Sequence, residues 1–389
     1  MNTKAQAIKN RLSLRKPQAD SLEILEKLAD VLELKKDVDV ASELSKVRAL
    51  YPTCADFERD FPSVCFSLAT GVGKTRLMGA FISYLYAAKG VKNYFVLAPN
   101  LTIYNKLIDD LSNPRSPKYV FRGISDFAIT APRIITGDNY AEARQSTLFK
   151  ESVKINIFNI SKINSEVRGG KEPRIKRLSE YLGESYFNYL SELPDLVLLM
   201  DESHHYRADS GLRAINELKP ILGLELTATP IDTKGVKFKN VVFDYPLARA
   251  LQDGFVKEPA VATRRDFNPD QYRNDPKELD LIKLEDGVRI HEDTKVALDI
   301  YARDSGNRLV RPFVLVVARD TDHAKEIRGL IESDRFFEGR YTGKVMEIHS
   351  NQRGEEKEEN VQRLIDLEKP ENPIEIVVHV NMLKEGWDV

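Results

Sequence analysis

The nine residues SLATGVGKT, Ser67 to Thr75, decide the expected fold class of this chain. The apolar run Ser63–Leu68 leads into them, and a stretch with helical spacing, Thr75–Ala88, follows. A glycine-containing loop between a strand and a helix is the sequence context of a phosphate-binding loop, or P-loop. Gly71 and Gly73 let backbone N–H groups approach phosphate oxygens, and the helix start adds the positive end of its dipole.

Six residues of this loop are candidates for nucleotide contacts. Lys74 is expected to place its charge on the β- and γ-phosphates, and Thr75 to offer its hydroxyl to Mg²⁺. The other candidates are Thr70, Gly71, Val72 and Gly73. A plain surface turn is the alternative interpretation of the same residues.

A second pattern supplies the acid that a phosphate loop needs for its metal ion. In LVLLMDESHH, Leu196 to His205, five apolar residues lead to Asp201 and Glu202. Ligands gather at the carboxyl ends of strands in open α/β sheets. We therefore expect Asp201 to hold Mg²⁺ and Glu202 to orient and deprotonate the attacking water, a solvated turn being the alternative. His204 and His205 lack a third ligand cluster, which disfavours zinc, and His204 is expected to link the nucleotide site to a neighbouring motif.

Strand-length apolar runs alternate with helical stretches along most of the chain, which indicates parallel sheets covered on both faces. The expected strands of the first series are Ser63–Leu68, Tyr94–Ala98, Ile155–Ile160, Leu196–Met200, Leu222–Leu226 and Val241–Tyr245. A second series is expected at Phe313–Ala318, Val345–His349 and Ile374–Val380, with helices at Asp320–Ser333 and Glu355–Leu367. The predicted fold class is α/β, with two such units in tandem.

The same patterns suggest boundaries between domains. Residues 1–60 are expected to form a helical N-terminal segment and residues 61–250 the first α/β domain. Residues 251–295 are expected to connect it to a partial second domain at 296–389. The stretch Ala262–Val288, with two prolines and many charges, predicts an irregular connection that leads into a helix at His291–Tyr301.

Composition narrows the class of protein. Hydrophobic residues make up 42% and charged residues 30% of the 389 residues, which is typical of a globular protein, and no apolar run approaches the ~20 residues of a membrane helix. Only Cys54 and Cys65 are present, so no disulfide framework is indicated and a cytoplasmic location is expected. The formal net charge of −2 requires any nucleic-acid contact to use a local basic track.

The ordered motifs resemble helicases of superfamily 2, of the DExH kind, and are most similar to the Res subunits of type III restriction–modification enzymes. SLATGVGKT and DESHH match motifs I and II, and LELTATP, Leu224 to Pro230, matches motif III. Superfamily 2 loops commonly lack the glycine at the first position of GxxxxGK[ST]. In this chain Leu68 occupies that position. The phrases YPLARALQDGFVKEP, LEDGVRIHEDTK, RPFVLVVARD and NMLKEGWDV resemble Res subunits specifically. The resemblance implies tandem RecA-like domains that bind ATP and Mg²⁺ between them, with a nucleic-acid strand across both.

The resemblance also assigns roles to single residues. Gln18, in RLSLRKPQADSL, would read the adenine edge, and Thr227 and Thr229 would couple the nucleotide site to movement. Residues implied to lie near nucleic acid are Pro99, Asn100 and Thr102 of motif Ia, Asn159 and Ser161 of the next motif, and Lys384 of motif V. Gly386 and Asp388 would face the nucleotide. Helix capping is the alternative for Asn100 or Thr102.

No QxxGRxxR-like segment, the motif VI of this superfamily, occurs in the 389 residues, and the sequence stops within motif V at Val389. We therefore expect an incomplete second domain in a fragment of a longer protein. An arginine finger contributes ~10³–10⁵ in rate, so the chain is expected to bind ATP but to hydrolyse it weakly. No convincing PD…(D/E)xK pattern is present, and no nuclease activity is assigned.

The leading prediction is an ATP-dependent translocase or helicase motor module that moves on double-stranded DNA in a type III restriction-like or phage-defence enzyme. A methyltransferase or specificity subunit is a further expected partner, and no membrane is involved. The alternatives are a DExH RNA helicase and a nucleotide-gated, nucleic-acid-binding scaffold without net hydrolysis. A P-loop kinase would leave LELTATP and NMLKEGWDV unexplained.

Overall fold

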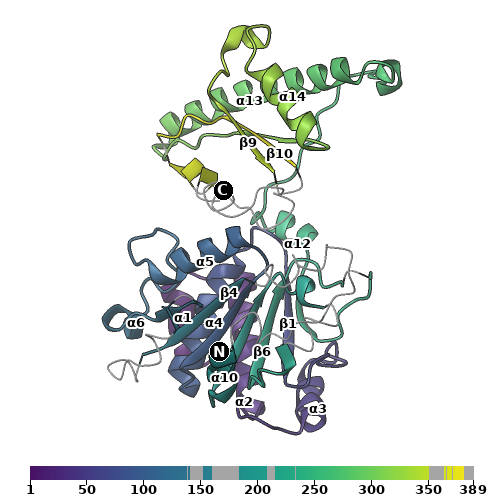
Figure 1. The fold of residues 1–389 in the computed structure, drawn as a ribbon. Coiled ribbons are helices and arrows are strands. Elements are labelled where there is room, and N and C mark those ends of the chain that lie inside the picture. The colour runs from purple at the N-terminus through teal and green to yellow at the C-terminus, as the bar shows by residue number, and fades with distance from the viewer. Residues whose placement is uncertain are drawn as a thin grey trace. The chain divides into compact units, whose positions relative to one another are not determined.

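The computed structural model describes residues 1–137, 139–140, 152–159, 184–207, 215–232, 234–349, 363–364, 366–369 and 371–380. The chain divides into two compact units, Met1–Pro259 and Ala260–Val389 (Figure 1). None of the helices in this described part combines the length and apolar character that crossing a bilayer requires.

The first unit is built on a seven-stranded sheet in which every described strand pairing is parallel, with the order β3-β4-β2-β5-β6-β1-β7. Its strands are β1 (Ser63–Leu68), β2 (Asn93–Ala98), β3 (Arg133–Ile135), β4 (Lys154–Asn159), β5 (Leu196–Asp201), β6 (Leu222–Thr227) and β7 (Val241–Tyr245). Six of them coincide with the predicted apolar runs. The seventh, β3, has only three residues and is too short to show a pattern.

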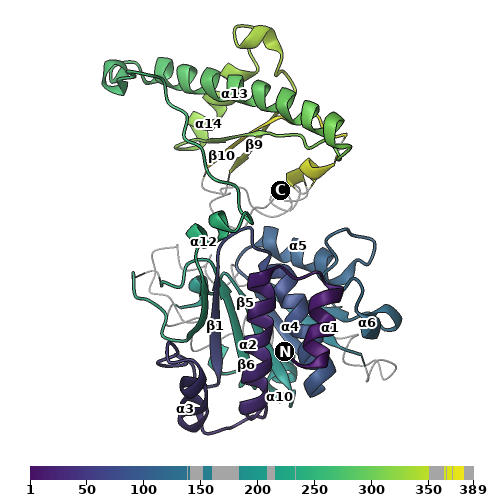
Figure 2. The same ribbon diagram turned by 180° about the vertical axis from the view of Figure 1, so that it is seen from behind.

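Helices cover both faces of this sheet, as continuous apolar strands require. The described helices are α1 (Thr3–Arg11), α2 (Lys16–Val31), α3 (Val40–Leu50), α4 (Lys74–Lys89), α5 (Leu101–Ser112), α6 (Ser125–Ile129), α10 (Glu184–Glu192), α12 (Leu247–Gln252) and the 3-10 helix η3 (Ser203–Tyr206). Figure 2 shows α1, α2 and α4 on one face of the sheet. Ala5 and Leu22 belong to the same apolar core as Phe81 and Val96, so the N-terminal helices pack as part of the first unit.

The second unit has a parallel sheet of three described strands in the order β8-β10-β9. They are β8 (Val314–Val317), β9 (Val345–His349) and β10 (Ile376–Val380). With them lie helices α13 (Pro276–Ser305) and α14 (Thr321–Ile331) and the 3-10 helices η4 (Pro269–Tyr272), η5 (Phe337–Gly339) and η6 (Asp366–Glu368). The predicted α/β fold class with two parallel sheets in tandem is thus confirmed. The predicted helix Glu355–Leu367 lies mostly outside the described residues.

The expected irregular connection is wrong in its second half, because α13 begins at Pro276 and not at His291. Asp275 caps this helix by accepting a hydrogen bond from the Glu278 amide at 3.1 Å, and proline is well tolerated in a first helical turn. Only a few side chains of α13 are buried, among them Leu284. Because most of this helix is polar and exposed, its sequence shows no clear apolar periodicity.

Candidate nucleotide site

The phosphate loop joins β1 to α4 at the carboxyl end of the first sheet. Gly71 and Gly73 have φ angles of 82° and 98°, in the left-handed region that favours glycine. A Cβ added to Gly73 would lie 2.5 Å from Nε2 of Gln18. Both glycines of the motif are therefore required, by backbone conformation and, at Gly73, by close packing as well.

Lys74 and Glu202 meet across this site. Lys74 Nζ lies 2.9 Å from Glu202 Oε1, and their side chains are only 10% and 14% exposed. Motif I and motif II, separated by more than a hundred residues in the sequence, are thus brought into direct contact. Thr75, in the first turn of α4, is half-buried.

Asp201 ends strand β5 and is 7% exposed. The Glu202 backbone amide donates a hydrogen bond to Asp201 Oδ1 at 3.1 Å. Burial, and then the charge of Glu202, raise the pKa of Asp201 to about 6, while Lys74 opposes the shift. A bound divalent cation would favour the ionised form, and the carboxylate of Asp201 and the hydroxyl of Thr75 are the hard oxygen donors that suit Mg²⁺. The donor set therefore fits the predicted metal.

The residues predicted to couple nucleotide and movement form a chain of contacts. His204 Nδ1 lies 3.0 Å from Thr227 Oγ1 and 3.7 Å from Glu202 Oε2. Thr227 Oγ1 accepts a hydrogen bond from the Thr229 amide at 3.0 Å. Motif II is thereby linked to motif III through His204 and Thr227, and a coupling role for these residues stays a prediction.

Gln18 lies in a position that the sequence did not predict. Its Nε2 donates hydrogen bonds to the carbonyl oxygens of Val72 and Gly73, at 3.1 and 2.9 Å, and its Oε1 accepts one from the Arg15 amide at 2.8 Å. The amide of this buried side chain therefore braces the phosphate loop itself. Contact with adenine stays a prediction for Gln18.

Arg15 is a second loop contact that sequence reasoning missed. Its Nη1 donates to the carbonyl oxygen of Gly71 at 2.9 Å, and its guanidinium lies 5.4 Å from the centroid of the Phe255 ring. Arg15 lies in RLSLRKPQADSL, the stretch quoted for Gln18, and Phe255 lies in the Res-like phrase YPLARALQDGFVKEP, but the sequence singled out neither residue.

The candidates for nucleic-acid contact are only partly placed. Asn100 Oδ1 accepts a hydrogen bond from the Ile103 amide at 2.9 Å, so Asn100 caps α5 as the alternative interpretation expected. Pro99 lies between Ala98, the last residue of β2, and Asn100. Asn159 is buried at the end of β4, paired in register with Ala98. The side chain of Thr102, and Ser161, Lys384, Gly386 and Asp388 entirely, lie outside the described residues.

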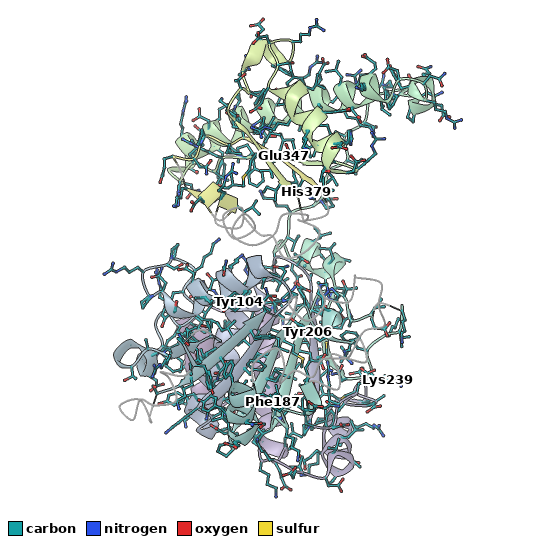
Figure 3. All side chains as sticks on the ribbon, in the orientation of Figure 1. Tyr104, Phe187, Tyr206, Lys239, Glu347 and His379 are labelled. Carbon is teal, nitrogen blue, oxygen red and sulfur yellow. The ribbon has the colours of Figure 1, made fainter. Side chains whose placement is uncertain are left out.

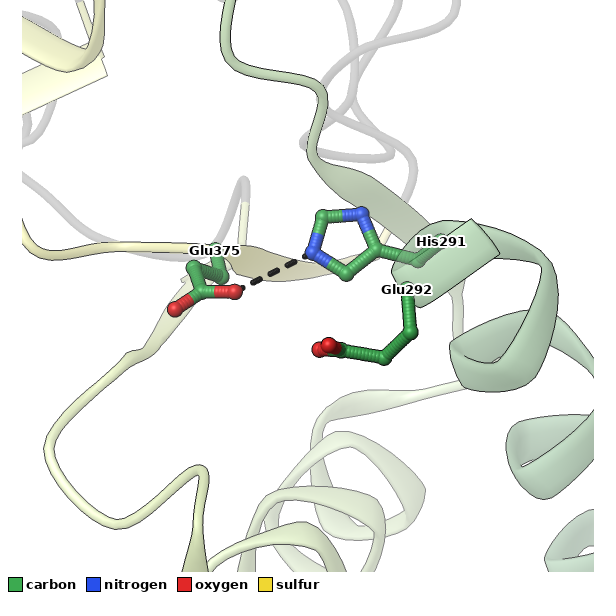
Figure 4. Close-up of side chains that lie close together, drawn as sticks. All are labelled: His291, Glu292 and Glu375. Carbon is green, nitrogen blue, oxygen red and sulfur yellow. Dashed lines mark hydrogen bonds and ion pairs between the residues drawn. The ribbon is translucent and has the colours of Figure 1, made fainter. Parts of the chain in front are cut away.

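One further cluster in the second unit has the spacing of metal ligands, among the residues that the structure describes: His291, Glu292 and Glu375 (Figure 4). His291 Nε2 lies 3.2 Å from Glu375 Oε2. However, Lys295 Nζ contacts Glu292 at 2.9 Å and Glu375 at 2.8 Å, and Lys344 Nζ contacts Glu375 at 2.6 Å. Because two ammonium groups already neutralise these carboxylates, we assign the cluster to ion-paired packing.

Comparison with known proteins agrees with the motif pattern. Residues 11–232, more than half of the chain, match the family described as type III restriction enzyme, res subunit. A Haemophilus influenzae protein described as the probable type III restriction-modification enzyme HindVIP Res subunit is 26% identical over 172 residues, which covers 41% of this chain and 29% of that protein. This chain therefore spans less than a third of that relative.

Two solved structures are also similar. The ATP-dependent type ISP restriction-modification enzyme LlaBIII bound to DNA matches with a TM-score of 0.47 and 15% identity, over 90% of this chain and 24% of that one. A variant of S. cerevisiae Dbp5 bound to RNA and ADP BeF3 matches with a TM-score of 0.44 and 11% identity, over 98% and 78%. By the family match and its ordered motifs, the chain belongs to the Res subunit family of type III restriction enzymes, with their superfamily 2 helicase-like motor.

Proposed function

We propose that this chain binds ATP and Mg²⁺ between its phosphate loop and motif II, and that hydrolysis there drives movement on double-stranded DNA. The observation that carries the proposal is the 2.9 Å contact between Lys74 Nζ and Glu202 Oε1, next to the buried Asp201. A cation and two carboxylates are thus gathered at one edge of the sheet, where nucleotides bind in α/β folds. We assign them the roles of phosphate contact, general base and metal ligand.

Each side chain has a distinct task in this proposal. Bound Mg²⁺–ATP supplies the phosphoryl group and the metal charge. Lys74 exchanges Glu202 for phosphate oxygens, which frees the Glu202 carboxylate to orient water and accept its proton. Asp201 and Thr75 would provide oxygen ligands for the metal. Gln18 and Arg15 hold the backbone of the loop so that its N–H groups keep their orientation.

We further propose that the 389 residues hydrolyse ATP slowly and that the motor serves a restriction-like, phage-defence enzyme together with a methyltransferase or specificity subunit. The absence of a QxxGRxxR-like segment from the sequence supports the first point, because an arginine finger contributes ~10³–10⁵ in rate. The description of the curated relative as a Res subunit of a restriction-modification enzyme supports the second.

The central test is Lys74→Ala, measured as affinity for a fluorescent ATP analogue with Mg²⁺. Loss of charge-assisted hydrogen bonds of about 1.5–3 kcal/mol predicts affinity weakened by about 10- to 100-fold. Lys89→Ala is the matched control, since Lys89 ends the same helix and pairs with Asp30 at 2.8 Å, outside the proposed site. Unchanged affinity in Lys74→Ala would refute the nucleotide site.

A second measurement addresses the nucleic acid and the rate. Duplex DNA is expected to stimulate the slow ATPase more than single-stranded DNA or RNA does, and binding should weaken with salt because phosphate contacts dominate. Stronger stimulation by RNA would favour an RNA helicase. Binding of DNA and ATP without any Lys74-dependent hydrolysis would favour a nucleotide-gated scaffold. Fast, DNA-stimulated turnover that Lys74→Ala abolishes would overturn the proposed slow hydrolysis.

A further inference from the structure

A cluster of buried charged residues surrounds Glu225 on β6, the strand that pairs with β5. Glu225 is fully buried, and its Oε2 accepts a hydrogen bond from Arg207 Nη2 at 2.6 Å. Its Oε1 accepts hydrogen bonds from Ser63 Oγ and Asn240 Nδ2, both at 2.9 Å, and lies 3.4 Å from Arg59 Nε. Burial alone would raise the pKa of Glu225, but the charges of Arg59 and Arg207 outweigh it and hold the pKa below its usual value. Two arginines therefore favour the ionised form of this carboxylate inside the sheet.

The guanidinium of Arg207 is held from several sides. Besides Glu225 it pairs with Glu58 through Nη1 and donates to Asn240 Oδ1 at 3.0 Å through Nη2. Its Cζ lies 3.7 Å from the centroid of the Phe238 ring. Only 5% of the Arg207 side chain is exposed. A planar, forked cation can satisfy these partners together, whereas the point charge of a lysine cannot.

Arg207 directly follows the motif II turn. The turn comprises Glu202 and the 3-10 helix η3, and the His205 amide donates to the Glu202 carbonyl oxygen at 3.0 Å. Tyr206, which is labelled in Figure 3, belongs to this turn. Its hydroxyl donates to the Leu97 carbonyl oxygen at 3.1 Å and so fixes the turn against β2. Glu202 itself has a φ of 47°, a left-handed conformation that a residue other than glycine keeps only when its surroundings enforce it.

Both ends of this turn are anchored to the strand that carries motif III. At its start, Asp201 is paired in register with Leu226 of β6. At its end, Arg207 is bound to Glu225, the residue before Leu226. The turn is thus attached to β6 at both ends, and Glu202, with its left-handed backbone, lies between the two points of attachment.

We propose that Arg207 is a positioning residue for ATP hydrolysis: by binding Glu225 it holds the motif II turn on β6, so that Glu202 keeps the backbone conformation from which it reaches the phosphate loop. This inference rests on the proposed function for its catalytic consequence. It assigns to Arg207 no contact with nucleotide or metal. Its loss therefore changes the hydrolysis step much more than nucleotide affinity.

The test uses Arg207→Lys in the full chain, which keeps the charge beside Glu225 but removes the fork. We expect hydrogen exchange at the His205 amide to become about tenfold faster in the absence of nucleotide. The single-turnover rate of ATP hydrolysis is expected to fall about tenfold, while affinity for the fluorescent ATP analogue changes by less than about threefold. Should Arg207→Lys not fold, the double variant Arg207→Met with Glu225→Gln removes both charges together and carries the same expectations.

Val47→Ala serves as the control, because Val47 is fully buried on α3 and its loss lowers stability without touching motif II. It should lower the melting temperature but leave His205 exchange and the hydrolysis rate unchanged. Equal His205 exchange in Arg207→Lys and wild type overturns the inference, as does an unchanged hydrolysis rate. If the wild-type chain fails to bind ATP, the proposed function fails, and the exchange measurement still decides whether Arg207 holds the turn.

Discussion

Asp201 and Glu225 are buried carboxylates on neighbouring strands of one sheet, and their pKa values shift in opposite directions. Burial and the charge of Glu202 raise the pKa of Asp201 to about 6. Glu225 is just as buried, yet Arg59 and Arg207 overcome its burial and lower its pKa. Among the described residues, no two arginines flank Asp201 as Arg59 and Arg207 flank Glu225. The nearby cation is Lys74, which pairs with Glu202 at 2.9 Å.

The difference agrees with the two roles proposed above, bracing for Glu225 and metal binding for Asp201. Around Glu225 the protein provides its own cations, and the charges of Arg59 and Arg207 balance those of Glu225 and Glu58 without any ligand. Around Asp201 a buried carboxylate is left short of positive charge, which a bound Mg²⁺ would supply. A carboxylate that is destabilised in this way is poised for a cation, whereas one that is already compensated holds strands together.

The largest effect on stability is expected when Glu225 loses one of its two arginines and becomes, like Asp201, a buried carboxylate short of positive charge. Arg207→Met leaves Glu225 buried with Arg59 alone, and breaking a buried ion pair by removing one partner costs about 3–5 kcal/mol of unfolding free energy. Urea unfolding at pH 7, followed by circular dichroism, measures the loss. Adding Glu225→Gln should recover only part of it, because the fully buried Arg59 then loses the carboxylate that lies 3.4 Å from its Nε. A loss below about 1 kcal/mol in the single variant would show that the cluster does not brace the sheet.

An intermediate effect of opposite sign is expected for Asp201→Asn. The pKa of Asp201 rises on folding from 3.8 to about 6, so its favourable contribution is present below pH 3.8 and is lost as pH rises through 6. At about 1.4 kcal/mol per pKa unit, the ionised carboxylate lowers the free energy of unfolding by at most about 3 kcal/mol at pH 8. Without Mg²⁺, the variant should therefore melt at a higher temperature than wild type at pH 8 and at the same temperature near pH 4. No gain at pH 8 would contradict the comparison.

The smallest effect on stability is expected at the less deeply buried cluster of the second unit, formed by His291, Glu292 and Glu375. Burial favours the neutral form of Glu375, but hydrogen bonds from Lys295, Lys344 and His291 lower its pKa to about 2. This contribution to stability is present above pH 4.5 and is lost as pH falls through 2. Because a fifth of the side chain is exposed, solvent screening limits the loss in Glu375→Gln to about 1 kcal/mol at pH 7.

Urea unfolding at pH 7 and pH 2.5 tests this last prediction, with the exposed Glu371→Gln as control. The difference between Glu375→Gln and wild type should narrow at the lower pH. A loss as large as that of Arg207→Met would show that depth of burial does not distinguish the two clusters.

The motifs with local chemistry could be predicted from the sequence alone. The apolar runs located every described strand of the first sheet except the three-residue β3. They also placed Lys74 at the start of the helix after β1, and Asp201 and Glu202 at the end of β5. Such signals are visible because strand burial, glycine turns and capping depend on neighbouring residues. The start of α13 was missed because most of its side chains face solvent and leave no apolar period.

Which residues brace the site was decided only by the tertiary structure. Nothing within ten residues of Arg207 indicates that its partners are Glu58, Glu225 and Asn240, since they lie on separate segments that meet only when β1, β6 and β7 pair. Gln18 likewise finds the phosphate loop more than fifty residues away, across the packing of α2 on α4. The sequence by itself thus predicted the parallel α/β fold and named the residues of the candidate nucleotide site. Folding alone determined the ion pairs and hydrogen bonds that hold this site in place, because long-range contacts follow from chain topology and not from local pattern.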